Sequence, residues 1–323
     1  MNRFRNILQV VDTSAEPEKS VGRAVIRAKE HRAKLRILDV VPTPPTAGLL
    51  PSGDTHIDPR IELINERQRQ LQALVRDYNE PPDIQIEVRT GRRFLEVIGS
   101  VLRHEHDLVI KAADDPDWTD RLFGSDDMHL LRKCPCPVQL EKPGPPASPG
   151  CIMAAVDFDP FDPDATQIQL NQRILELAST EALLTGAELH VLHVWNAPAE
   201  GLLQRWSPDP VAARSEYLGS LHARHRDHFE QMRQELHARL QAQDGSDVVP
   251  RFHLLQGSPV TILPRQAREL NADLVVMGTL ARTGISGLFM GNTAEAVLDQ
   301  LGCSVLAIKP AGFRSPVRVE EEE

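Results

Sequence analysis

Short apolar runs alternate with amphipathic stretches along the whole chain. In the first half, they predict strands near residues 6–11, 35–41, 84–89, 107–112 and 136–140, and helices near 17–32, 58–79, 93–105 and 125–133. In the second half, they predict strands near 151–156, 188–194, 248–255, 273–278 and 304–309, and helices near 166–185, 209–242, 258–270 and 291–301. Strands that are apolar throughout and separated by helices favour an α/β fold with doubly wound parallel sheets.

The second half of the chain repeats the first. RNILQVVD at 5–12 corresponds to GCIMAAVD at 150–157, and DLVIK at 107–111 corresponds to DLVVM at 273–277. A proline-rich stretch, KPGPPASPG, separates the two copies and suits neither strand nor helix. We therefore predict two domains, at 1–142 and 151–311, joined by a linker at 143–150 and followed by an acidic tail at 312–323.

A glycine-bearing loop joins the expected strand at 273–278 to the expected helix at 291–301. The backbone N–H groups of such a loop, next to a helix start, suit a phosphate. Asn292 and Thr293 follow Gly291 and are candidates to cap the helix or to donate to that phosphate. Glycine spacing alone is a weak signal, and a tight turn without a ligand is the alternative.

The loop resembles the signature of the universal stress protein family, in which Gly-x-x-Gly, nine residues and Gly-Ser/Thr hold the phosphates of ATP. Gly278 takes the first place and Gly291 the third, while Ala281 stands at the second and Asn292 replaces the Ser/Thr. The methyl group of Ala281 lies where the loop backbone would approach a phosphate. The segments HDLVIK, HLLRKCPCPV, GTLARTGIS and GNTAEAVLD extend the resemblance over both halves, to the tandem E-type members of proteobacteria.

The resemblance implies two tandem universal-stress-protein domains. Each would be a Rossmann-like (HUP) doubly wound parallel sheet of five strands, and the two would pack as an intramolecular pseudo-dimer; pairing into a homodimer is left open. Asp157 ends the first strand of its half, where a carboxylate either binds a ribose or caps the next helix. The implied nucleotide site of the second domain consists of Asp157, Val194, Met277, Gly278, Ala281, Arg282, Gly291, Asn292 and Thr293.

The first half departs from this pattern. Alanine and aspartate replace the first two glycines of the loop, which carries further aspartates. Carboxylates beside a triphosphate in a poorly solvated site would repel it by roughly several kcal/mol. We therefore predict that the first domain does not bind ATP and serves as the structural partner of the second. The counterparts of the site in this degenerate domain are Asp12, Val40, Ala112, Asp115, Gly124 and Ser125.

Composition narrows the class of protein further. The 323 residues carry a formal net charge of −10, which disfavours nucleic-acid binding. The sequence shows no signal-peptide apolar region and no apolar run of membrane-spanning length. Its four cysteines lack paired zinc spacing. These features indicate a cytoplasmic protein that binds neither nucleic acid nor membranes.

Candidate chemistry outside the loop is sparse. The aspartates of DFDPFDPD, residues 157–164, form either a proline-broken acidic loop or a carboxylate source for Mg²⁺ bound with a nucleotide. His225 and His228 share the predicted helix at 209–242 with an apolar stripe, and we expect them to border the core rather than to bind a metal. The loop has no Gly-Lys-Ser/Thr sequence, and no catalytic set emerges.

Three functions remain open. The first is a universal stress protein that acts in the response to DNA damage, oxidants or starvation and binds ATP or another adenine nucleotide in domain 2 as a sensor, not an enzyme. The second is an interaction module, or one that binds a different small molecule or a lipid. The third is a slow Mg²⁺-dependent ATPase.

Overall fold

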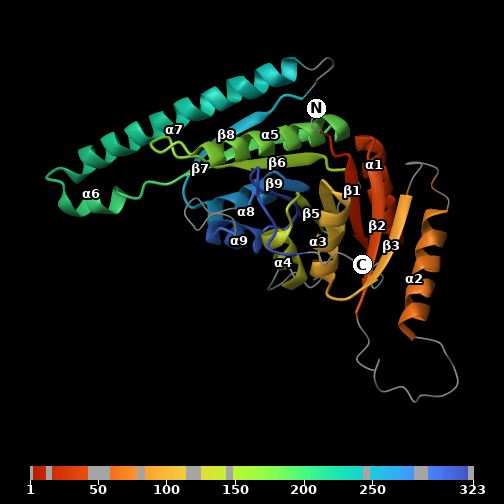
Figure 1. Ribbon diagram of the computed structural model, residues 1–323. Helices are drawn as coiled ribbons and strands as arrows, with labels where there is room; N and C mark the ends of the chain where they lie inside the picture. Colours follow the sequence, from red (N-terminus) through yellow and green to blue (C-terminus); the bar gives the residue numbers. More distant parts are fainter. Residues whose placement is uncertain are drawn as a thin grey trace. The chain divides into compact units, whose positions relative to one another are not determined.

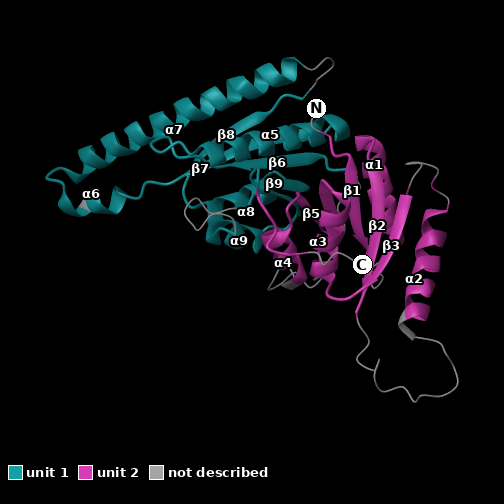
Figure 2. Ribbon diagram, in the orientation of Figure 1, with its two compact units in different colours: residues 1–2, 148–284, 289–312 teal, residues 3–147, 285–288, 313–323 magenta. Residues whose placement is uncertain are grey.

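The computed structural model describes residues 3–11, 17–42, 59–76, 78, 84–113, 125–142, 148–242, 248–279 and 290–318 (Figure 1). Contacts divide the chain into two compact units. One, the second-half unit, takes in residues 1–2, 148–284 and 289–312, and the other, the first-half unit, takes in 3–147, 285–288 and 313–323 (Figure 2). Each unit contains a parallel sheet with its own helices.

In the first-half unit, the strands follow the order β3-β2-β1-β4-β5, and all described pairings are parallel. Strand order therefore reverses between β1 and β4. The elements are β1 (Asn6–Val11), α1 (Pro17–His31), β2 (Lys34–Val41), α2 (Pro59–Val75), β3 (Ile84–Thr90), α3 (Arg93–His104), β4 (Leu108–Ala112), α4 (Ser125–Lys133) and β5 (Val138–Glu141).

In the second-half unit, the strands follow the order β10-β9-β6-β7-β8, again parallel, and the order reverses between β6 and β9. Figure 1 shows α5 and α7 on one side of strands β6 to β8, and α8 and α9 on the other. The elements are β6 (Cys151–Val156), α5 (Ala165–Thr185), β7 (Glu188–Trp195), α6 (Glu200–Trp206), α7 (Pro210–Gln241), β8 (Arg251–Gln256), α8 (Pro259–Glu269), β9 (Leu274–Gly278), α9 (Asn292–Leu298) and β10 (Ser304–Ile308).

Local sequence explains where these elements begin and end. The central strands are apolar on both faces because helices cover both, and four of the five residues of β9 are buried. Helix α5 begins at an Asp164 cap, whose side chain accepts a hydrogen bond from the Thr166 N–H, and ends at Gly186 in the left-handed conformation with φ 71°. Pro259 occupies the first turn of α8, where a missing N–H costs nothing.

The sequence repeat is matched by an identical strand register. Ile7 of β1 pairs with Leu108 of β4, and Ile152 of β6 pairs with Leu274 of β9. The residue before each of these later strands is an aspartate whose carboxylate accepts two backbone hydrogen bonds. Asp107 accepts from the N–H groups of residues 5 and 6 at 2.7 and 2.9 Å. Asp273 accepts from residues 150 and 151 at 2.8 and 3.1 Å.

The expected α/β architecture, with five parallel strands in each half, is confirmed. Helix α6 was not predicted, and α9 ends at Leu298, earlier than the expected 301. The domain boundaries and the internal pairing of the two domains stay predictions. None of the helices within the described ranges is long and apolar enough to cross a membrane.

Candidate functional site

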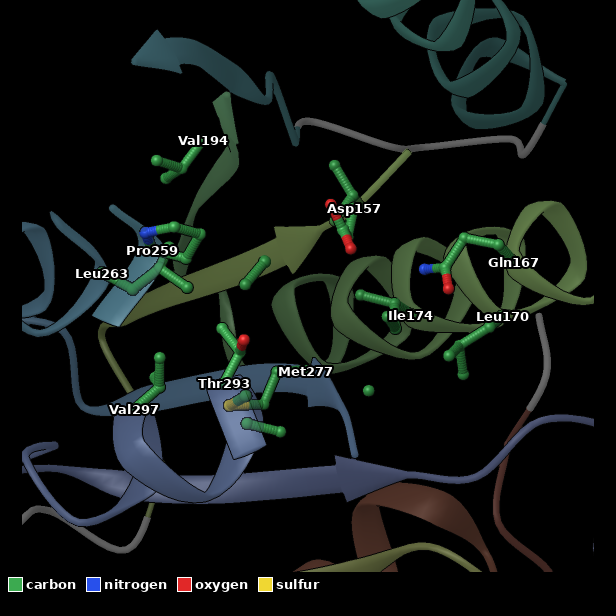
Figure 3. A pocket seen from close by; sticks show the side chains of 14 residues that line it. Asp157, Gln167, Leu170, Ile174, Val194, Pro259, Leu263, Met277, Thr293 and Val297 are labelled. Atoms are coloured by element: carbon green, nitrogen blue, oxygen red, sulfur yellow. The ribbon is translucent and has the colours of Figure 1, made fainter. Parts of the chain in front are cut away.

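A cavity opens at the carboxyl ends of β6 and β9, where the strand order of the second-half unit reverses (Figure 3). This is the position at which doubly wound sheets bind ligands. Strands β6, β7 and β9 and helices α5, α8 and α9 all contribute to its wall. The lining residues are Ala155, Val156, Asp157, Gln167, Leu170, Ile174, Val194, Pro259, Leu263, Met277, Gly278, Thr293, Ala294 and Val297.

The cavity brings together residues that the sequence placed in one site from distant segments. Asp157, Val194, Met277, Gly278 and Thr293 all line it. Its wall is mostly apolar, with a few polar groups, as is usual for small-molecule sites. The structure therefore gathers these predicted residues around one space, without identifying what fills it.

The two ends of the cavity differ in character. Figure 3 shows Asp157 and Gln167 toward one end and Val194, Pro259 and Leu263 toward the other. Gln167 lies on the first turn of α5 and was not anticipated as part of the site. Its polar side chain, facing the carboxylate, gives this end two groups that can hydrogen-bond a ligand.

Gly278 has a packing role that the loop motif does not reveal. A Cβ atom at this position would lie 2.7 Å from Cδ2 of Leu170, well inside van der Waals contact. Leu170 belongs to α5 and is itself part of the cavity wall. Glycine at the end of β9 thus lets α5 approach the sheet closely, and a larger residue would force Leu170 to shift.

Asn171 holds the main chain of Asp157 in place. The Asp157 N–H donates to Asn171 Oδ1 at 3.1 Å, and Asn171 Nδ2 donates to the Asp157 carbonyl at 2.6 Å. Asn171 is buried and accepts a further, weak hydrogen bond of 3.5 Å from Gln167 Nε2. Sequence reasoning missed this residue, although the i, i+4 spacing from Gln167 puts both on one face of α5.

The base of the glycine loop is fixed by its own hydrogen bonds. Gly291 N–H donates to the Thr279 carbonyl at 3.0 Å, which brings the two ends of the loop together. Nζ of buried Lys309, just beyond β10, donates to Thr279 Oγ1 at 2.7 Å. Lys309 was not among the predicted residues, because it lies far from the loop in sequence and reaches it only through the pairing of β9 with β10.

One of the two alternatives for Asn292 and Thr293 is excluded. Asn292 and Thr293 do not cap α9, since Gly291 is the N-cap residue and no side chain makes a capping hydrogen bond. Both residues are exposed members of the first helical turn, and only Thr293 lines the cavity. Gly291 itself is buried, and its N–H is already paired with Thr279.

The acidic loop after β6 satisfies backbone groups. Asp164 caps α5, and Asp159 Oδ1 accepts from the N–H of Phe161 at 2.9 Å. No set of three histidine, cysteine or acidic residues suited to a metal ion occurs within the part of the chain that the structure describes. The hydrogen bonds of Asp159 and Asp164 fit the interpretation of this segment as a proline-broken acidic loop.

Histidines pack against the strand end that carries the site. His193 Nδ1 lies 3.3 Å from the carbonyl of Val156, so it donates there and leaves Nε2 to accept from His225 Nδ1 at 2.9 Å. The ring of Phe158 stacks on His193, with centroids 3.7 Å apart. His225 is buried at the core edge, as expected, while His228 contacts Phe158 at 4.6 Å between ring centroids.

Several predicted residues fall outside the described ranges. These are Asp12, Asp115, Gly124, Ala281 and Arg282. In the first-half unit, Val40 is buried near the end of β2, Ala112 ends β4, and Ser125 begins α4.

The sequence model of the universal stress protein family matches residues 3–140 and 152–309. The chain belongs to the universal stress protein family. Each half carries one copy of the domain, and membership supports a role in the response to stress.

Two relatives match this chain along its whole length. The chain is 30% identical over 330 residues to universal stress protein E of Escherichia coli (strain K12), covering 100% of this chain and 99% of that protein. It is 29% identical over 331 residues to universal stress protein E of Salmonella typhi, covering all of both chains. A solved structure of a functionally unknown protein from Pseudomonas aeruginosa PAO1 superimposes with a TM-score of 0.68 at 27% identity, covering 96% of this chain and 94% of that one.

Proposed function

We propose that the second domain of this universal stress protein binds ATP or another adenine nucleotide and acts as a cytoplasmic sensor in the stress response. The observation that carries the proposal is the cavity where β6 and β9 end, with Asp157, Val194, Met277, Gly278 and Thr293 in its wall. This location and this mixture of groups suit a nucleoside.

The polarity of the cavity suggests an orientation for the nucleotide. The apolar end, with Val194, Pro259 and Leu263, suits the flat faces of a purine. The Asp157 carboxylate suits the hydroxyl groups of a ribose, because an ionised carboxylate only accepts hydrogen bonds. Thr293 then lies on the side where the loop between Gly278 and Gly291 begins and ends, and its hydroxyl can donate to a phosphate.

We infer that the domain binds its ligand without catalysing phosphoryl transfer from it. Phosphoryl transfer needs charged groups that stabilise the transition state. Among the described lining residues, the only charged side chain is that of Asp157, which is an anion. Lys309 is directed at Thr279 and is not part of the cavity wall.

A second candidate is a small ligand without phosphates. Two observations favour it: the mostly apolar wall, and the Gly291 N–H, which already donates to Thr279. A phosphate would have to use other donors of the loop. This alternative keeps the same cavity and differs only in the chemistry of the occupant.

The deciding experiment is isothermal titration of the full chain with ATP and Mg²⁺, and in parallel with AMP and adenosine. We expect one site per chain with micromolar affinity, tightest for ATP. Two near-isosteric variants test the contacts: Asp157→Asn should weaken all three ligands, whereas Thr293→Val should weaken ATP more than adenosine. Gln169→Ala, an exposed change on α5, is the matched control and should leave all three affinities unchanged.

The same titrations distinguish the two candidates. Equal affinity for ATP and adenosine would contradict a phosphate site while retaining a nucleoside site. No heat with any of the three ligands would reject the nucleotide proposal. Native mass spectrometry of the purified chain would then identify a co-purifying small molecule.

A further inference from the structure

The two domains differ at two equivalent positions of the site. Lys111 of β4 pairs with Val10 of β1 in the same register in which Met277 of β9 pairs with Ala155 of β6. In the helix that follows, Asp127 is the third residue of α4, as Ala294 is of α9. Met277 and Ala294 line the cavity, so its first-half counterpart has a lysine and an aspartate in their places.

These two charged residues form a buried ion pair. Lys111 Nζ lies 2.9 Å from Asp127 Oδ1 and also donates to the Ala112 carbonyl at 2.9 Å. Water reaches neither side chain, whose exposed fractions are 2% and 0%. The two charges therefore compensate each other inside the first domain, with hydrogen-bond geometry that suits a charge-assisted contact.

Exposure supports the view that this region is filled. Counted over the whole residue, Lys111 is 1% exposed, against 5% for Met277, and Asp127 is 0% exposed, against 7% for Ala294. The two charged residues are thus at least as well buried as the shorter residues at the equivalent positions of the second domain.

The neighbouring wall follows the same trend. Val97 of α3, placed after Gly91 as Leu263 of α8 is placed after Gly257, is 0% exposed, whereas Leu263 is 8% exposed. The α3 residue is thus better buried than its counterpart on α8.

We propose that the Lys111–Asp127 ion pair acts as an internal occupant that closes the first domain's counterpart of the cavity. A ligand that entered would have to break the 2.9 Å contact between two buried opposite charges, which is unfavourable. Of the two equivalent positions, that of the second domain then stays open to a ligand. The inference rests on the cavity itself and does not depend on the nucleotide proposal.

Exchange of the two residue pairs between the domains tests this inference. In the first domain, Lys111→Met with Asp127→Ala installs the side chains of the open site. In the second domain, Met277→Lys with Ala294→Asp installs the ion pair. The readouts are crystal structures of both double variants and of the wild type, and the number of ATP molecules bound per chain by titration.

We expect the first double variant to show a cavity at the ends of β1 and β4, and the second to lose the cavity at β6 and β9, with the new ammonium and carboxylate about 3 Å apart. ATP stoichiometry per chain should fall to zero in the second double variant. A folded first variant whose structure stays filled at this place overturns the inference. If that variant does not fold, the second decides, and a cavity that persists beside the installed pair overturns the inference.

The two proposals fail in different ways. A wild-type chain that binds no ATP contradicts the proposed function, yet the crystal structures still decide whether the ion pair closes the site. A wild-type chain that binds two ATP molecules overturns the closure and leaves nucleotide binding intact.

Discussion

Leu170 packs directly over Gly278: a Cβ atom on residue 278 would lie 2.7 Å from Cδ2 of Leu170. The first glycine of the loop therefore contributes to the packing of α5 on β9, whatever the loop binds. A loss of ligand binding in a Gly278 variant would not by itself report on a phosphate contact.

Gly278→Ala is expected to lower the free energy of unfolding by about 1–3 kcal/mol, because overpacking forces α5 or the strand to shift. Adding Leu170→Ala should make the double variant less destabilised than the sum of the two single changes. Urea unfolding measures all four forms. Gly219→Ala is the matched control: it lies on α7, with nothing within 4 Å of its added Cβ, and should stabilise by about 0.5–1 kcal/mol. Strict additivity of the two site changes would contradict the packing argument.

Asn171→Asp is expected to destabilise the second domain by about 2 kcal/mol or more. A carboxylate in this buried place can accept from the Asp157 N–H but cannot donate to the Asp157 carbonyl, which is left facing a negative charge. Hydrogen exchange of peptides covering the end of β6 should become faster in the variant. Gln169→Ala on the same helix, at an exposed position, should change neither stability nor exchange. Unchanged exchange at Asp157 in the Asn171 variant would show that the clamp does not order this strand end.

Replacing one residue of the buried ion pair should lower the free energy of unfolding far more than replacing both. Lys111→Met alone and Asp127→Ala alone are each expected to lower the free energy of unfolding by about 3–5 kcal/mol, because each removes the opposite charge that lies 2.9 Å from a buried charged group. The free energy of unfolding of the double variant should lie within about 1 kcal/mol of the wild-type value or exceed it, since two apolar side chains need no charged partner. Denaturant unfolding of the four forms gives the coupling energy. Single variants that cost nothing would mean that water or another group solvates the remaining charge.

Stability should fall as the pH is lowered from 7 to 5, in part through His106. Burial, then the nearby Arg36 and His104, lower the pKa of His106 from 6.5 to about 4. Its Nδ1–H donates to Asn6 Oδ1 at 3.0 Å, which leaves the buried Nε2 with no hydrogen-bond partner that the structure describes. The unfolded chain takes up this proton near pH 6.5, so between the two pKa values acid favours unfolding.

We expect His106 to contribute about 1–2 kcal/mol to the loss of unfolding free energy between pH 7 and pH 5, after allowance for solvent screening. His106→Gln should reduce the pH dependence by that amount. His222→Gln, at an exposed position on α7, should leave it unchanged. Equal pH dependence in the wild type and the His106 variant would place the titrating group elsewhere.

Much of the fold was predictable because its signals are local. Each strand of the described sheets is an apolar run bounded by turn residues, and the repeat of DLVIK as DLVVM fixed the correspondence between the halves before any pairing was known. Helix α6 was missed because its short sequence, EGLLQRW, has too few turns to show a helical period. Capping of α9 by Asn292 or Thr293, one of two alternatives, is excluded because Gly291 occupies the N-cap position, which glycine can also take.

The sequence by itself determined the tandem α/β architecture, and its resemblance to the family predicted that Asp157, Val194 and Gly278 belong to one site; all three line the same cavity. Tertiary structure alone decided three contacts: Asn171 with the Asp157 backbone, Lys309 with Thr279, and Lys111 with Asp127. The physical reason is that strand order and register, set by packing of the whole domain, bring these groups within hydrogen-bond distance. Their partners lie 14 to 30 positions away in the chain, beyond the reach of any helical or strand periodicity.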